Sequence, residues 1–499
     1  MTPPSEFGSD YDDPRTPAPA VAVPDTRHCE VQIVRNEFRN FDPYRATYTP
    51  PAACQGPWSK VVLRMHGAVQ GVQYDRLGHI TIGGVGIFRT STPEPSADGI
   101  AWDVEKDVTS YIPLLRTPQP VVMELGNVVN DTYTGVLDIT VTLDFYMADH
   151  HTPPATTANT VLPLQNQTRE DSDLIGTATL PRNTTRLLGE VYVTGSGGGC
   201  EEFWDTSAPA ATGYSCPDGS PYREVDVSID GKLAGIALPY PYIYTGGWSN
   251  PYSWRPSPAP RAFDIKPLTY DLTPFAGLLT DGKPHEFRVH VDGVPAGQSG
   301  WFTVPNLHVW TDAHRAQTTG SLTSYAVSPL AKTDDVTGAP NQAGSVDTNA
   351  SRSLAISGYV DTSAGRVRTS VNRTLSNVSR HTWDAGESRD VLDANWRDTA
   401  TTTSNGRVDR TELDYGKNGV LTFLPNATIP GGYDVVTDLK IHDTSRTPGR
   451  TSTETYDGRA SWIYGVPRDQ RHATGTQTVR YRAIGHGCFD HTLTAVNGV

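Results

Sequence analysis

Long hydrophobic runs are missing from this chain of 499 residues. No stretch of about 18 apolar residues occurs, which is the length that a helix needs to cross a membrane, so we expect no membrane association. Basic residues are too few to balance the acidic ones, since 41 Lys and Arg face 55 Asp and Glu and leave a formal net charge of −14. Phosphate binding needs a basic face, so a nucleic-acid partner is not expected either.

Signatures of several common enzyme classes are absent as well. No Gly-x-Ser-x-Gly motif occurs, so hydrolysis by a Ser/His/Asp triad is not expected. No haem, flavin or nicotinamide fingerprint is present either. The segment from His285 to His290 has one residue more than the zinc-protease helix motif, and on a strand its two histidines would point to opposite faces. We therefore expect carboxylate chemistry with neither a metal nor another cofactor.

Cysteine is scarce, with five residues and no Cys-x-x-Cys pair or zinc-ligand spacing. Cys29 with Cys54, and Cys200 with Cys216, bracket loop-rich segments and suit two local disulfides in an oxidising compartment. Cys488 is left over, either buried or unpaired. The chain opens on a Pro-, Asp- and Ser-rich tail without an apolar signal core, which favours a mature secreted or extracytoplasmic protein whose signal peptide is absent.

What the sequence does contain is typical of β-structure. Hydrophobic residues make up 36%, while 46 Gly and 39 Pro favour many short strands joined by turns over long helices. Apolar and polar residues alternate in the ranges 137–145, 225–229 and 287–291. Each range predicts a strand with one buried and one solvated face, as in antiparallel sandwiches. The predicted fold class is all-β.

Two stretches of the chain repeat one plan. In the first, Ile80-Thr81-Ile82 meets Gly83-Gly84, and a segment ending in two leucines follows at 107–115. In the second, Val227-Ser228-Ile229 meets Asp230-Gly231, and a similar segment follows at 271–279. A further strand begins near Val121 and near Phe287. The simplest account is a pair of related β-sandwiches.

The expected organisation has four parts. Residues 1–24 look like a disordered tail, 25–155 a first sandwich, 165–315 a second sandwich, and 316–499 an accessory β domain. The last part is Ser/Thr-rich and is expected to hold shorter alternating strands, such as Tyr433 to Ile441 and Thr478 to Ala483. Two sandwiches side by side leave a groove, which is a usual place for a site.

The step Asp75-Arg76 before the predicted strand at 77–82 is the first candidate site. A carboxylate there could activate water and the guanidinium could orient an oxygen-rich group, although the two could also form a structural ion pair. The repeat places Arg223 opposite Arg76, but Tyr222 opposite Asp75. The Arg can therefore belong to the scaffold of both sandwiches, whereas the Asp is favoured as functional.

A glycine run leads into the second candidate, Cys200-Glu201-Glu202-Phe203-Trp204. A disulfide at Cys200 would pin this loop, and aromatic bulk would raise a carboxyl pKa, although an ordinary turn with solvated glutamates fits equally well. Glu124 lies inside an apolar strand run, where it is either a structural ion-pair partner or a functional acid.

A loop rich in aromatic residues is the last candidate. Trp248, Trp254 and Arg255 lie within it; indole rings stack on sugar faces, and an Arg can bond sugar hydroxyls. Loop aromatics also pack under neighbouring loops, so the support for carbohydrate binding is modest.

Several stretches together carry a family resemblance across most of residues 28–150. They include Tyr48-Thr49-Pro50-Pro51, Gln73-Tyr74-Asp75-Arg76, Gly83-Gly84-Val85, the range 89–95, Glu105-Lys106-Asp107-Val108-Thr109 and Leu125-Gly126-Asn127. In these the chain resembles the acidic peptide–N-glycanases of type A, and more distantly those of type F. The resemblance implies two tandem jelly-roll-like sandwiches and hydrolysis of the amide between an N-glycan and asparagine, which leaves aspartate and a glycosylamine.

The resemblance also implies roles for individual residues. Asp75 matches the essential Asp of a Trp-Asp-Arg step in type F, with Tyr74 here in place of the Trp, and Glu202 matches an essential Glu two residues after a Cys. Glu124 matches a supporting Glu. The expected substrate contacts are Arg76, Glu201, Trp204, Trp248, Trp254 and Arg255.

The partner implied is an N-glycopeptide or glycoprotein, bound by a monomer. Two other classes stay open: a glycosidase that cuts between sugars with paired carboxylates, and a lectin-like protein without chemistry.

Overall fold

The computed structural model describes residues 13–95, 98–170, 172–195, 200–244, 258–298, 300–427, 433–463, 474–483 and 487–496. Strands dominate these ranges, and the helices within them are only one or two turns long, such as η3 (Glu201–Thr206) and α2 (Thr273–Ala276). In these ranges no helix is long and apolar enough to cross a membrane.

Eight strands between residues 28 and 147 form two four-stranded antiparallel sheets. One has the order β1-β8-β3-β6 and the other β2-β7-β4-β5, which is the strand order of a jelly roll. The strands are β1 (His28–Phe38), β2 (Tyr44–Tyr48), β3 (Trp58–Val69), β4 (Leu77–Ile82), β5 (Val85–Ser91), β6 (Ile100–Asp107), β7 (Gln119–Leu125) and β8 (Leu137–Met147). Alternate residues such as Leu63, Val141 and Phe145 are fully buried between the sheets.

Nine strands between residues 160 and 311 repeat this arrangement. Their sheets have the orders β9-β17-β12-β15 and β11-β16-β13-β14, with β10 added beside β11. The strands are β9 (Thr160–Pro163), β10 (Gln165–Glu170), β11 (Asp173–Ala178), β12 (Thr184–Gly195), β13 (Glu224–Ile229), β14 (Lys232–Ala237), β15 (Leu268–Asp271), β16 (His285–Asp292) and β17 (Trp301–Thr311). The predicted fold of two tandem antiparallel sandwiches is confirmed.

The sequence repeat coincides with equivalent hairpins of the two sandwiches. The β4–β5 turn is made by Gly83-Gly84, and the β13–β14 turn by Asp230-Gly231. All four residues have positive φ, between 47° and 82°, which two-residue hairpin turns require and which Gly and Asp tolerate. The shared turn chemistry explains why the sequence shows the repeat most clearly there.

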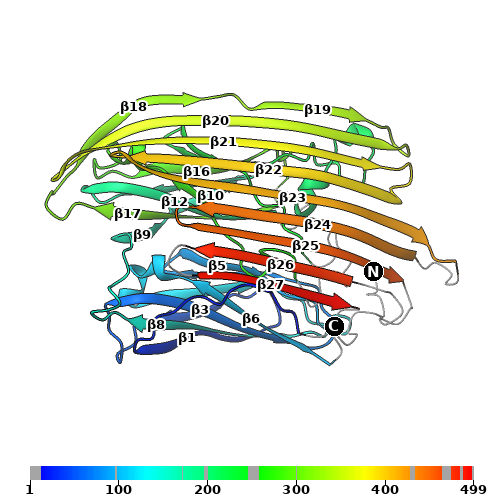
Figure 1. Ribbon diagram of the computed structural model, residues 1–499, viewed down its shortest axis with the longest axis horizontal. Helices are drawn as coiled ribbons and strands as arrows, with labels where there is room; N and C mark the ends of the chain where they lie inside the picture. The colour runs from blue at the N-terminus through cyan, green and yellow to red at the C-terminus, as the bar shows by residue number, and fades with distance from the viewer. Residues whose placement is uncertain are drawn as a thin grey trace.

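Ten strands after residue 318 form one large antiparallel sheet. They are β18 (Thr319–Val327), β19 (Ala331–Thr337), β20 (Gly344–Thr362), β21 (Gly365–Trp383), β22 (Arg389–Ser404), β23 (Arg407–Pro425), β24 (Tyr433–Thr447), β25 (Arg450–Ile463), β26 (Thr474–Ala483) and β27 (Gly487–Val496). Figure 1 shows them, yellow-green to red, crossing the molecule beside both pairs of sheets. Leu354 and Trp396 of this sheet join the core of the second sandwich, and Leu439 and Tyr456 join that of the first.

The expectation of shorter strands in this last part is wrong. Strands β20, β21 and β23 each have 19 residues. Their inward positions include buried polar residues such as Thr348 and Asn377, and their outward positions are rich in Ser, Thr and Arg. The apolar alternation that marks a strand is therefore interrupted in the sequence although the backbone pairing continues.

Both predicted disulfides are present, Cys29–Cys54 and Cys200–Cys216. Cys488 is an exposed free cysteine on β27. The first disulfide joins the start of β1 to the loop before β3, and the second closes the segment that carries η3.

Candidate functional site

The candidate site lies where the β4–β5 side of the first sandwich meets β12 and β17 of the second. The side chain of Asn306 on β17 accepts a hydrogen bond from Gly86 N–H at 3.0 Å and donates one to Gly86 C=O at 2.7 Å. The buried guanidinium of Arg89 donates to Thr194 Oγ1 on β12 at 2.6 and 3.0 Å and lies 3.6 Å from the ring centroid of Phe302. These contacts hold the two sandwiches in one orientation.

Asp75 lies two residues before the start of β4, in a segment held by hydrogen bonds on both sides. Arg76 N–H donates to Thr92 Oγ1, and Thr92 N–H donates to Arg76 C=O, both at 2.9 Å. On the other side, Gln73 Oε1 accepts from Tyr74 N–H at 3.0 Å and from Arg76 Nη2 at 2.7 Å. Because strand pairing continues past the end of the hairpin, the Asp75-Arg76 step has a defined position.

The charge of an acid from the other sandwich acts on Asp75. Burial raises the pKa of Asp75 well above its usual value, the negative charges of Glu94 and Glu202 raise it further, and Arg76 opposes them. Burial also raises the pKa of Glu202, which lies in η3 after β12. The charge of Glu202 thus acts on Asp75 although the two residues are far apart in the sequence, and we refer to Asp75, Glu94 and Glu202 as the acid cluster.

The loop that carries Glu202 is held from two directions. The disulfide to Cys216 fixes Cys200, whose backbone N–H donates to Asp218 Oδ2 at 2.8 Å. Glu201 points into the interior, where it is 0% exposed. Arg223 donates to its two oxygens at 2.9 and 2.7 Å, and the indole N–H of Trp301 donates to it as well.

Two predicted substrate contacts are therefore interior groups. All the donors around Glu201 belong to the protein, and a buried carboxylate needs such partners to offset its loss of hydration. Trp204 is 2% exposed, with its ring packed against Trp301 and Trp396 at centroid distances of 6.3 and 5.8 Å. We correct the expectation for both residues, which anchor η3 to the core, and leave them out of the proposed site.

The second sandwich offers an internal comparison for Asp75-Arg76. Arg223 directly precedes β13 as Arg76 precedes β4, but it is fully buried and also donates to the carbonyls of Asp218, Ser220 and Tyr222. Tyr222, at the place of Asp75, donates its hydroxyl hydrogen bond to Glu224. In the second sandwich this position is a closed structural network. By contrast, the buried Nε of Arg76 has no hydrogen-bond partner among the described residues.

Glu124 lies on β7 with its side chain 59% exposed, and its Oε2 is 3.8 Å from His79 Nδ1. Burial and the charges of Arg89 and Arg169 lower the pKa of His79 to about 3, so this His is neutral and the contact is not an ion pair. The strongest charges on Asp75 come from other acids. The remaining predicted contacts, Trp248, Trp254 and Arg255, lie outside the described residues.

Two residues in or near the cluster were not predicted. Glu94, 2% exposed, belongs to the segment that returns from β5, and Tyr244, also 2% exposed, has a buried hydroxyl without a hydrogen-bond partner among the described residues. The charges of Glu202 and Asp75 contribute to the raised pKa of Tyr244. The hairpin turn at Gly83-Gly84 could have pointed to Glu94, because the residues just after β5 must return beside those just before β4.

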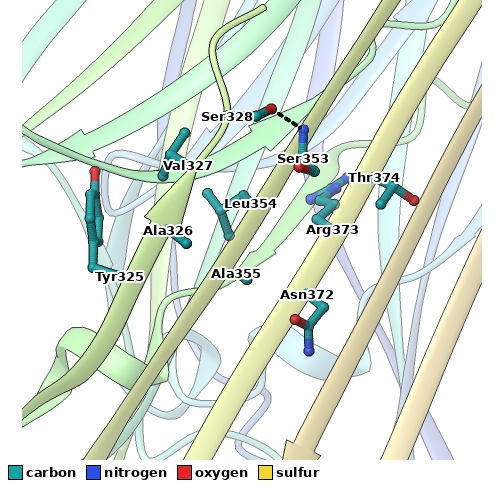
Figure 2. A pocket seen from close by; sticks show the side chains of 10 residues that line it. All are labelled: Tyr325, Ala326, Val327, Ser328, Ser353, Leu354, Ala355, Asn372, Arg373 and Thr374. Carbon is teal, nitrogen blue, oxygen red and sulfur yellow. Dashed lines mark hydrogen bonds between the residues drawn. The ribbon is translucent and has the colours of Figure 1, made fainter.

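A cavity of about 570 Å³ lies elsewhere, where β18, β20 and β21 meet (Figure 2). Figure 2 shows Tyr325, Leu354 and Arg373 among its lining residues. The Arg373 guanidinium is already paired with Asp398 at 2.8 and 2.6 Å, and no carboxylate lines the cavity. Over the ranges that the structure describes, no group of three or more His, Cys, Asp or Glu is placed to hold a metal ion.

The fold and the candidate site define a class: an all-β protein of two jelly rolls, with candidate acids contributed by both sandwiches. The family described as "Peptide N-acetyl-beta-D-glucosaminyl asparaginase amidase A" matches residues 17–328, and the chain belongs to this family.

A relative in Prunus dulcis, "Peptide-N4-(N-acetyl-beta-glucosaminyl)asparagine amidase A", is 33% identical over 382 residues. The match covers 70% of this chain and 66% of the relative, so the chain spans just under two thirds of that protein's length. Among solved structures, PNGase F, a glycosylasparaginase from Flavobacterium meningosepticum, has a TM-score of 0.37 at 14% identity, over 57% of this chain and 96% of its own. PNGF-II has a TM-score of 0.39 at 16% identity, over 58% of this chain and 66% of its own.

Proposed function

We propose that this protein is a peptide–N-glycanase, which hydrolyses the amide between N-acetylglucosamine and asparagine in N-glycopeptides or glycoproteins. The observation that carries the proposal is the meeting of Asp75 and Glu202, both with raised pKa, beside Arg76. Membership of an amidase family supports the same activity. The products are a glycosylamine and a peptide in which aspartate replaces asparagine.

Amide hydrolysis requires one group that removes a proton and another that supplies one. Two carboxyl groups that repel each other in a partly buried site lose their protons in separate steps, so over an intermediate pH range the pair holds one proton. In our proposal the reactive form of the pair has Asp75 ionised and the proton on Glu202. Because the pKa of Asp75 is the more strongly raised of the two, this is the minor one-proton form. Ionised Asp75 takes a proton from water as the water oxygen adds to the amide carbon. Protonated Glu202 gives its proton to the amide nitrogen as the C–N bond breaks.

Arg76 completes the proposed site as a substrate contact. Its Nη2 is held by Gln73, and its buried Nε–H is free of partners within the described residues, so that it can donate to the amide or acetamido oxygen. The supporting role of Glu124 and the sugar contacts of Trp248, Trp254 and Arg255 stay predictions. We propose a monomer that acts in an oxidising, extracytoplasmic compartment, where disulfides such as Cys200–Cys216 persist.

One experiment separates this activity from its rivals. A short N-glycopeptide is incubated with the protein, and the peptide product is weighed by mass spectrometry. An amidase leaves an unglycosylated peptide with aspartate in place of asparagine, a glycosidase leaves one N-acetylglucosamine on asparagine, and a lectin leaves the mass unchanged.

The first site variant to compare is Asp75→Asn, which keeps the shape of the side chain and removes the base. We expect its turnover to fall by about 10²–10⁴-fold, since that is the usual contribution of a proton-transfer residue. Full activity in this variant would remove Asp75 from the mechanism.

A further inference from the structure

A third acid lies in the cluster, and the proposed mechanism does not use it. Glu94 follows the end of β5 and is 2% exposed, although a carboxylate is costly to bury. Its segment is tied to the Asp75-Arg76 step by the two hydrogen bonds between Thr92 and Arg76, each 2.9 Å long. The chain therefore holds Glu94 beside the step that carries Asp75.

Two acidic neighbours and one basic neighbour act on Asp75 among the described residues. Among the charges that raise its pKa, that of Glu94 acts more strongly than that of Glu202, and Arg76 is the cation that opposes them. Tyr74 and Tyr133 face the same region, with ring centroids 5.5 Å apart, and Glu94 also contributes to the raised pKa of Tyr74.

One buried hydroxyl within reach of the cluster's charges is left without a hydrogen bond among the described residues. The hydroxyl of Tyr244 is buried and lacks a hydrogen-bond partner among the described residues, although the charges of Glu202 and Asp75 both reach it. A purely structural network tends to satisfy such a group, as Tyr222 and Glu224 do in the second sandwich.

We propose that Glu94 is a positioning residue of this site, whose carboxylate beside Asp75 sets the pH range in which Asp75 can accept a proton. This inference builds on the proposed function. In this proposal Glu94 acts through Asp75.

The expected effect has a definite sign. Removal of the negative charge of Glu94 makes ionisation of Asp75 easier, so the pKa of Asp75 falls. Since Asp75 must be ionised to act as the base, activity would then rise at a lower pH. A unit charge roughly 6 Å away at an effective dielectric constant near 20 shifts a pKa by about two units, and solvent screening reduces this to about one.

The test is the pH dependence of kcat/KM for release of aspartate-containing peptide, measured from pH 3 to 8. For Glu94→Gln we expect the acid limb to lie about one pH unit lower than in the unaltered protein. Glu94→Asp withdraws the charge by one methylene and should shift the limb less, in the same direction. Glu286→Gln is the matched control, because it removes the same charge from an exposed carboxylate on β16, outside the proposed site, and its acid limb should not move.

Each outcome decides between the alternatives. An unmoved limb in Glu94→Gln, or a shift in Glu286→Gln alone, overturns the inference and leaves the amidase activity standing. If Glu94→Gln does not fold, the limb of Glu94→Asp decides in its place. If the unaltered protein releases no aspartate-containing peptide, the proposed function fails, and the inference about Glu94 fails with it.

Discussion

Glu201 and Glu202 are neighbours, and the structure predicts opposite consequences when each is changed. Glu201 is 0% exposed and accepts hydrogen bonds from Arg223 and from the indole of Trp301. Glu201→Ala leaves the Arg223 guanidinium buried without its counter-charge, a change that typically costs about 3–5 kcal/mol. Three backbone carbonyls still accept from Arg223, which places our expectation near 3 kcal/mol.

Such a loss is a large fraction of the free energy of unfolding, which is about 5–15 kcal/mol for most proteins. We expect the urea midpoint of Glu201→Ala to fall by about 1 M or more, because the slope against urea is about 1–3 kcal/mol per molar for small proteins. Below the new transition, KM should stay near that of the unaltered protein, since Glu201 contacts no substrate in our account.

Glu202→Gln is the matched comparison. Burial raises the pKa of Glu202, so its ionised form is penalised in the folded protein, and a neutral side chain of the same shape removes that penalty. We expect unfolding at pH 7 to need the same urea concentration or more, while turnover falls by about 10²–10⁴-fold. The reasoning is refuted if Glu201→Ala keeps its stability and raises KM, or if Glu202→Gln is destabilised and stays active.

Two further predictions concern buried groups. Tyr244→Phe removes a buried hydroxyl that has no partner among the described residues, so the melting temperature should stay the same or rise; Tyr240→Phe, with the same deficiency, is its control, and a clear drop in either would show that the hydroxyl is satisfied. Burial and the charge of Asp443 raise the pKa of Glu454 from 4.5 to about 8. Between these pH values the folded protein binds more protons than the unfolded chain, so stability falls as pH rises. Glu454→Gln should flatten that decline in melting curves recorded from pH 4 to 9, and an unchanged slope would contradict it.

Much of the fold follows from local patterns. The alternation at 137–145 and 287–291 marks strands because one face of each sheet is buried and the other is solvated. The disulfides could be paired because each joins cysteines close in sequence, 25 and 16 residues apart. The long strands after residue 318 were less predictable, because their inward faces bury polar groups such as Thr348, which interrupt the apolar pattern.

The candidate site was only partly predictable. Asp75 could be selected because its counterpart in the repeat, Tyr222, cannot serve as a base. The different surroundings of Glu201 and Glu202 could not be predicted from the neighbouring sequence. The two residues that donate hydrogen bonds to Glu201 lie 22 and 100 residues away in the chain. Glu94 was overlooked because nothing in its own segment distinguishes it from an exposed acid.

The sequence by itself therefore determined the class of structure and the repeat, since alternation and turn chemistry are properties of neighbouring residues. The comparison of the two copies made Asp75 the leading candidate acid. Only the tertiary structure decided which carboxylates lie near enough to change one another's pKa. The pKa of a carboxyl group depends on the charges and the burial around it in space, and the packing of β4 and β5 against β12 and β17 sets both. That packing brings Glu202 to Asp75 and turns Glu201 away into the core.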